Sequence, residues 1–292
     1  MNYMKSVVCL LLLLPIMAHA SAQWPNEPAG APVLFDCDFS HPTCNGRLLD
    51  PYGSAGNTLT AQSDATAPMS PSGVTRSTES FQSGNGGTEL HYFLPAGNNE
   101  IFVGLVWRSS ATFGTNNPGA NKTQFIRGQA GGTNGVFYWQ RPRGSSLSRL
   151  FFSTQLANNL DQCHGAPDQD QCFQNVNDIQ LTPGVWYKIE VYLKRSTCPT
   201  CHNGILRWWI NGTLAGNYLN FAYVGADEWV WSETWDGAGN GSGFTVNPEH
   251  YFDHLHISAP NCPSGCGGTG GEPVADTTPP GRASGLTITQ LN

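Results

Sequence analysis

A stretch in the middle of the chain, residues 185–218, alternates apolar and polar residues with a period of two. Successive side chains of a pleated strand point to opposite faces, so this pattern predicts strands and excludes a helix. The Asn203-Gly204 and Asn211-Gly212 pairs supply residues that accept the positive φ of tight turns. The stretch therefore predicts two long strands with one buried face. The other face carries Trp, Tyr, Lys, Glu and Arg side chains.

The same alternation recurs along the chain and predicts the fold class. It predicts further strands at 33–39, 89–94, 100–108, 122–127, 136–141, 150–154 and 250–258, with a short one near 57–61. No long helical pattern separates them. About ten strands without intervening helices predict an all-β protein, built as a two-layer antiparallel β-sandwich.

Composition restricts the partners. The chain has 34 Gly, 20 Pro and only 12% charged residues, which is typical of a turn-rich β protein. A formal net charge of −7 argues against nucleic acid and against an anionic membrane surface as the main partner. The net charge does not argue against an anionic polysaccharide as the partner, because a local basic groove can coexist with an acidic whole. We expect a monomer.

The two ends of the chain differ in character from its middle. Residues 1–22 have the pattern of a secretory signal peptide: Lys5, an apolar run, then Ala-x-Ala exits. They predict a secreted protein, extracellular or periplasmic. Residues 23–260 are expected to form the sandwich domain. Residues 261–292 are a Gly- and Pro-rich linker and a disordered tail, which resembles the start of a truncated fibronectin type III module.

Eight cysteines remain once Cys9 leaves with the signal peptide. An even number in an exported chain favours disulfides, and we predict pairing between close neighbours in the sequence. The predicted pairs are Cys37 with Cys44, Cys163 with Cys172, Cys198 with Cys201, and Cys262 with Cys266. The alternative is a zinc site built from the last four of these cysteines, whose knuckle spacing is acceptable.

Three stretches together resemble a known family. NNEIFVGLVWRSSATFGTNNPGANKTQFI, GVWYKIEVYLK with NGILRWWINGTLAGNY, and WDGAGNGSGFTVNPEHYFDHLHIS are similar to secreted jelly-roll (LamG-type) domains of the concanavalin A-like superfamily, in particular to polysaccharide lyase-like proteins. The resemblance runs over residues 33–258. It implies a jelly roll of two curved sheets, with a sugar-binding groove on the concave one. Lectins, hydrolases, lyases and adhesion modules share that fold, so it does not imply one activity.

A lyase that cleaves a uronate polymer by β-elimination needs a group that neutralises the carboxylate, a base and a proton donor. Residues of these types lie on the predicted strands. The catalytic candidates are Lys122, Tyr138, His254 and His256. The substrate-binding candidates are Asn121, Gln124, Gln140, Arg141, Arg207 and Trp209. Trp209 would stack on a sugar ring and Arg207 would hold a carboxylate or hydroxyls.

The last predicted strand assigns side chains to faces. Simple alternation groups Tyr251, Asp253, Leu255 and Ile257 on one face, and Phe252, His254 and His256 on the other. Two histidines at i and i+2 can act as base, ligate a metal, or decorate a solvated face. We expect His254 and His256 to lie close to Arg207 and Trp209 on one sheet. No cofactor is required, but the resemblance implies a structural calcium ion held by Asp36, Asp38 and Asp253.

Three functions therefore compete: a polysaccharide lyase, a noncatalytic carbohydrate-binding domain, and an adhesion module. A glycoside hydrolase is disfavoured, because the chain lacks the strand-borne Glu-x-Asp-x-x-Glu pattern that places two carboxylates together. Only Glu228, Glu233 and Asp236 cluster, in a segment predicted to be an acidic loop. Carbohydrate recognition is common to the first two functions, and the sequence favours it.

Overall fold

The computed structural model describes residues 23–49, 58–78, 89–111, 120–128, 134–140, 149–155, 177, 179–225, 227–234 and 249–261. Within these residues the regular structure consists of thirteen β-strands, and no helix occurs. The all-β prediction is confirmed. Since the described residues contain no helix, they also contain none that is long and apolar enough to cross a membrane.

Eight antiparallel strands form the larger sheet. Its main path runs β11-β10-β9-β5-β13-β3-β2, and β1 pairs with β13 beside that path. The strands are β1 (Val33–Cys37), β2 (Thr58–Gln62), β3 (Val74–Thr78), β5 (Glu100–Ser109), β9 (Tyr187–Lys194), β10 (Gly204–Ile210), β11 (Thr213–Phe221) and β13 (Glu249–Ser258). Residues near both ends of the described chain therefore lie side by side in one sheet.

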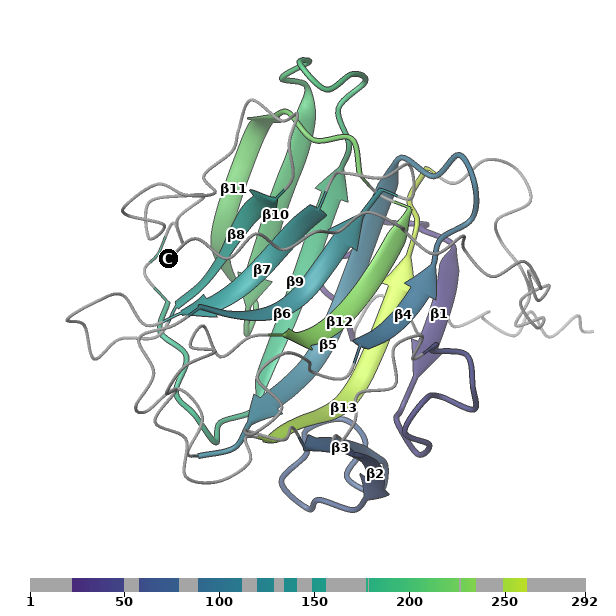
Figure 1. The fold of residues 1–292 in the computed structure, drawn as a ribbon, viewed down its shortest axis with the longest axis vertical. Coiled ribbons are helices and arrows are strands. Elements are labelled where there is room, and N and C mark those ends of the chain that lie inside the picture. The colour runs from purple at the N-terminus through teal and green to yellow at the C-terminus, as the bar shows by residue number, and fades with distance from the viewer. Residues whose placement is uncertain are drawn as a thin grey trace, which may run out of the picture.

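Five antiparallel strands form the second sheet, in the order β4-β12-β6-β7-β8. They are β4 (Glu89–Phe93), β6 (Ala120–Arg127), β7 (Asn134–Gln140), β8 (Arg149–Gln155) and β12 (Glu228–Thr234). Figure 1 shows this sheet lying in front of the larger one. Two antiparallel layers without helices make a sandwich of the jelly-roll class, as predicted.

The core between the sheets consists of the buried faces that the alternation predicted. Ile189, Val191 and Leu193 of β9 lie in it, together with the matching residues of β5 and β10. Trp107 crosses this layer and meets Trp139 of the second sheet edge to face, with 5.1 Å between ring centroids. Alternation predicts this core correctly because burying apolar side chains on one face is the main stabilising contribution to a sandwich.

The outer face of the larger sheet is covered too, which the alternation did not predict. Phe102 and Val106 point away from the main core, yet they are fully buried against Trp24. Trp24 lies so close to Gly104 that a Cβ atom there would come within 2.4 Å of the indole ring. The segment 23–32, called here the N-terminal strap, therefore packs across β5.

A β-bulge changes the face assignment of β13. The register shifts between Phe252 and His254, so Phe252 joins Leu255 in the core. The prediction that Phe252 shares a face with the two histidines is wrong, because a bulge inserts one residue and reverses the alternation beyond it. The histidines keep their predicted position opposite Leu255.

Three strands lie where none was predicted. β3 lies in a segment rich in Gly, Ser, Thr and Pro, and β11 continues the hairpin after β10. β12 corrects the acidic loop: Glu228–Thr234 is a strand of the second sheet, between β4 and β6. The prediction of a solvated loop rested on the acidic residues, but Glu228 is buried in this strand.

Two of the four predicted disulfides lie within the described residues, and both are confirmed. Cys37 is bonded to Cys44, and Cys198 to Cys201. Disulfide sulfurs are not thiolates, so the zinc site that needs Cys198 and Cys201 is wrong. The other four cysteines, at 163, 172, 262 and 266, lie outside the described residues.

Candidate functional site

A cavity of about 280 Å³ opens where β1, the disulfide-closed turn after it and β13 meet. Its lining residues are Asp36, Cys37, Asp38, Ser40, Cys44, Asn45, Arg47 and His254. Alternation along β1 explains why Asp36 lines this cavity: Phe35 and Cys37 point to the core, so Asp36 between them points away from it. Cys44, Asn45 and Gly46 have positive φ values of 53°, 61° and 78°, and this turn returns the chain to the cavity.

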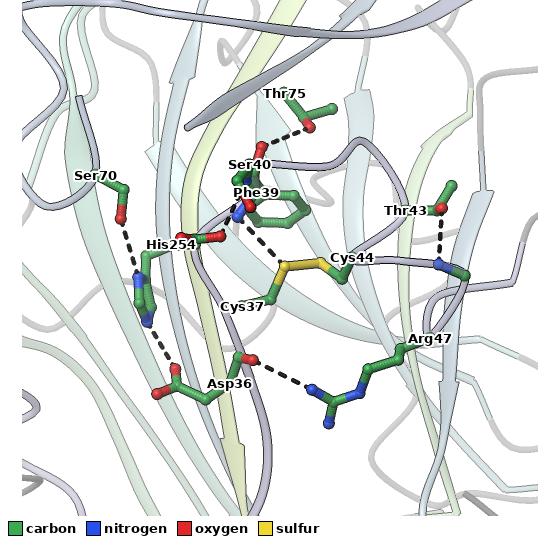
Figure 2. Close-up of a disulfide and its surroundings, with 12 residues drawn as sticks. Asp36, Cys37, Phe39, Ser40, Thr43, Cys44, Arg47, Ser70, Thr75 and His254 are labelled. Atoms are coloured by element: carbon green, nitrogen blue, oxygen red, sulfur yellow. Dashed lines mark hydrogen bonds and ion pairs between the residues drawn. A yellow bond between two sulfur atoms is a disulfide. The ribbon is translucent and has the colours of Figure 1, made fainter. Parts of the chain in front are cut away.

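Asp36 is hydrogen-bonded to His254 at the wall of this cavity. His254 Nε2 lies 2.6 Å from Asp36 Oδ1, and Ser70 Oγ lies 3.4 Å from the other ring nitrogen. Figure 2 shows Ser70, His254 and Asp36 in one line. Burial alone would raise the pKa of Asp36, but its bonds to His254 and His256 outweigh this and hold the pKa far below its usual value. Asp36 is therefore ionised.

Asp38 and Arg47 supply the remaining charges of the cavity. The backbone N–H of Ser40 donates to Asp38 Oδ1 over 3.0 Å, and this bond lowers the pKa of Asp38. Arg47 Nη1 donates to the carbonyl oxygen of Asp36 over 3.4 Å, and the guanidinium stacks 4.4 Å from the centroid of the Phe35 ring. The cavity thus combines two carboxylates, a guanidinium, an imidazole, an amide and a hydroxyl.

His256 lies deeper and has a different environment. Its Nε2 is 2.9 Å from Glu27 Oε1, its Nδ1 is 3.6 Å from Asp36 Oδ1, and Trp24 stacks on the ring. Burial lowers the pKa of His256, but the bonds to Asp36 and Glu27 outweigh it and raise the pKa to about 9. At neutral pH the ring is an imidazolium, which lacks the free lone pair that a base needs.

The structure places Arg207 and Trp209 on the same sheet as the histidines but not beside them. β9 and β5 lie between β10 and β13. Three strand intervals correspond to about 14 Å. Arg207 Nε donates to Asn217 Oδ1 over 2.9 Å on the neighbouring strand β11. Trp24, packed on Gly104, occupies part of the surface in between.

Five of the predicted site residues lie on β6 and β7, where the structure describes their backbone. Lys122 is paired with Tyr138, Asn121 with Trp139, and Gln140 with Ala120. Gln124 lies between the sheets, 1% exposed, where it accepts a hydrogen bond from Trp229 Nε1 over 3.3 Å. Arg141 lies outside the described residues.

The carboxylates expected to hold calcium do not fit that role. Asp253 accepts hydrogen bonds from the backbone N–H groups of Met69 and Ser70, over 2.6 and 2.5 Å. Asp36 is directed to the two histidines instead. Across the described part of the chain, no group of three or more His, Cys, Asp or Glu side chains is arranged to hold a metal ion. We therefore derive no chemistry from calcium.

A second charged cluster, on the five-stranded sheet, was missed by the sequence reasoning. His91 is 3% exposed and lies between two carboxylates: its Nδ1 bonds Glu228, and its Nε2 is 2.8 Å from Glu89 Oε2. Arg127 Nη2 lies 3.6 Å from Glu89 Oε1. Burial lowers the pKa of His91, but the two carboxylates raise it overall. In the sequence, the signal for this cluster was the Glu89-x-His91 spacing, which places both side chains on one face of a strand.

Searches with protein-family models and against curated sequences found no match. Solved structures with a similar arrangement of strands were found. A mutant of the alginate lyase Aly36B, in complex with alginate tetrasaccharide, is 17% identical over 64% of this chain and 81% of its own, with a TM-score of 0.47. The cellulose-induced protein Cip1 is 15% identical over 77% and 96%, with a TM-score of 0.48. The alginate lyase vAL-1 from Chlorella virus is 14% identical over 70% and 89%, with a TM-score of 0.45.

Proposed function

We propose that this chain is a secreted carbohydrate-binding domain, and that the cavity beside the Cys37–Cys44 disulfide holds one sugar residue of a polysaccharide. The observation that carries the proposal is the polar lining of a cavity of about 280 Å³. This volume is just below the ~300–1,000 Å³ of small-ligand sites, as expected for a site that holds one sugar residue. Its donors and acceptors are the groups that bind sugar hydroxyls, which both donate and accept.

The roles of the lining residues follow from their charges. The carboxylates of Asp36 and Asp38 accept hydrogen bonds from hydroxyls, while Arg47 and Asn45 donate to ring and hydroxyl oxygens. The disulfide fixes the turn that carries Asn45 and Arg47 to the strand that carries Asp36. Disulfides are typical of exported proteins, which supports secretion together with the signal-like residues 1–22.

Isothermal titration calorimetry with a panel of oligosaccharides tests the proposal. Arg47→Gln should weaken binding of the best ligand about tenfold, since a charge-assisted hydrogen bond is removed. Arg207→Gln serves as the control, because it removes the same kind of side chain at a position away from the cavity, and it should leave the affinity unchanged. Equal affinities for both variants would place the binding site elsewhere.

A second candidate function is β-elimination of a uronate polymer on the five-stranded sheet. What favours it is the register, which pairs Lys122 directly with Tyr138 on neighbouring strands. A lysine can neutralise the uronate carboxylate, and a tyrosine can transfer the proton. The product would carry an unsaturated uronate, so ultraviolet absorbance would rise with wild-type protein but not with Tyr138→Phe. No rise with any uronate polymer would eliminate this function and leave the binding proposal intact.

A further inference from the structure

The charges of the residues that line the cavity determine whether it favours an anionic, a neutral or a cationic sugar. Of its eight lining residues, Asp36 and Asp38 carry negative charge and Arg47 carries positive charge. With His254 neutral the lining has a net charge of −1, and with His254 protonated it is zero. In neither state does the lining attract an anion overall. A uronate carboxylate would face one guanidinium and two carboxylates, so its binding is disfavoured.

The two carboxylates also have unused hydrogen-bonding capacity. Asp36 uses Oδ1 for its bonds to the histidines, and Asp38 uses Oδ1 for the Ser40 N–H. Among the described residues, the Oδ2 atom of Asp36 accepts no hydrogen bond from the protein. An ionised carboxylate offers about four acceptor positions, which is more than the Ser40 contacts of Asp38 use. Both side chains therefore keep acceptor capacity for a cationic donor.

The position of these carboxylates suits an ammonium group. Asp36 and Asp38 both line the cavity. An ammonium group has several N–H donors, so it can bond to one oxygen of each carboxylate from within the cavity. His254 does not compete for this group, because its two nitrogens face Asp36 and Ser70.

We infer that the cavity selects a sugar with a free amino group, whose ammonium lies between Asp36 and Asp38 while Arg47 and Asn45 hold its hydroxyls. The inference rests on the proposed function, since it names the sugar class that the same cavity binds. The Ser40 hydroxyl and the Asn45 amide provide the neutral part of the lining.

Calorimetry with three matched ligands tests this inference. The ligands are glucosamine oligomers, the same oligomers with N-acetylated amines, and uronate oligomers of equal length. A chelator is present throughout, so that divalent cations do not occupy the carboxylates. We expect glucosamine oligomers to bind about tenfold tighter than the acetylated ones, because acetylation removes a charged hydrogen bond.

The Asp38→Asn variant adds a readout at the site. It is isosteric at an exposed position, so the fold should persist, and unchanged thermal unfolding verifies that. It should weaken the binding of glucosamine oligomers more than the binding of acetylated oligomers, and so remove most of the tenfold preference. Equal or tighter binding of acetylated or uronate oligomers by the wild type would overturn the inference but keep the proposed function. Absence of binding to all three classes and to the wider panel would overturn both.

Discussion

His256 and Glu27 are hydrogen-bonded over 2.9 Å although they are 229 positions apart in the sequence. Two further bonds tie the N-terminal strap to the larger sheet: Asn26 donates from N and Nδ2 to the fully buried Glu190, over 3.1 and 2.9 Å. Lys188 Nζ donates to the carbonyl oxygen of Gln23 and lies over the Trp24 ring. The strap is therefore part of the folded domain.

The first prediction concerns alkaline pH. The pKa of His256 is raised to about 9, so its stabilising contribution is fully present below its ordinary value of 6.5 and is lost as pH rises through 9. The free energy of unfolding should fall by ~2–3 kcal/mol between pH 6 and pH 9.5. Urea denaturation at a series of pH values measures it.

The control for this prediction removes the titrating ring. The His256→Gln variant should be less stable at pH 6 and should lose less stability between pH 6 and pH 9.5 than the wild type. His91, whose pKa is also raised, accounts for part of the remaining slope. A wild-type stability that is the same at both pH values would contradict the assignment.

The second prediction concerns the contact between Trp24 and Gly104. Gly104→Ala should destabilise the domain by ~1–3 kcal/mol, because the new methyl group overlaps the Trp24 ring. In a Trp24→Ala background the same substitution should cost well under ~1 kcal/mol, since the overlapping ring is gone. A double-mutant cycle by chemical denaturation measures the difference. Additive costs would show that the strap does not pack on Gly104.

The third prediction concerns the buried cluster around His91. Glu228→Gln removes one of the two carboxylates that bond to the His91 ring, which is 3% exposed. It should lower the free energy of unfolding by ~2 kcal/mol, because one partner of a buried charged pair is lost. The pKa of His91 should fall in this variant, which NMR titration of the ring detects. Asp38→Asn, at an exposed carboxylate, is the control and should cost less than ~0.5 kcal/mol. An unchanged His91 titration would refute the pairing.

The fourth prediction concerns the disulfides. Cys37 and Cys44 are separated by 7 positions, and Cys198 and Cys201 by 3. Short loops constrain the unfolded chain only modestly, so replacing either pair by serine should cost ~2 kcal/mol. Only the Cys37→Ser/Cys44→Ser variant should also weaken sugar binding, because that disulfide lines the cavity. Peptide mapping without reduction should find Cys163 with Cys172 and Cys262 with Cys266; free thiols there would refute those pairs.

The sequence predicted the strands whose alternation is regular and whose faces differ in polarity. β5, β9 and β10 were predicted with their buried faces, because the pattern and the burial have the same local origin. β12 was missed because acidic residues among tryptophans suggested a loop. In the structure one of those acidic residues, Glu228, is paired with His91 of a neighbouring strand.

The candidate site was predicted in part. Asp36, Asp38 and His254 were named, but for a calcium ion or a base, and their meeting in one cavity depends on the pairing of β1 with β13. Arg47 and Asn45 were not named, since they follow a strand in a turn without a repeating pattern. The alternation of apolar and polar residues does not indicate the bulge before His254. It also does not indicate that Trp24 packs over β5.

By itself, the sequence determined the fold class and the local disulfides at Cys37–Cys44 and Cys198–Cys201, because periodic burial and short loop closure depend on residues that are neighbours in the chain. Only the tertiary structure decided which polar side chains share a site. Asp36 reaches His254, and Glu27 reaches His256, across more than two hundred positions. Such pairs depend on strand order and register, which are set by the packing of the whole sandwich and not by any local pattern.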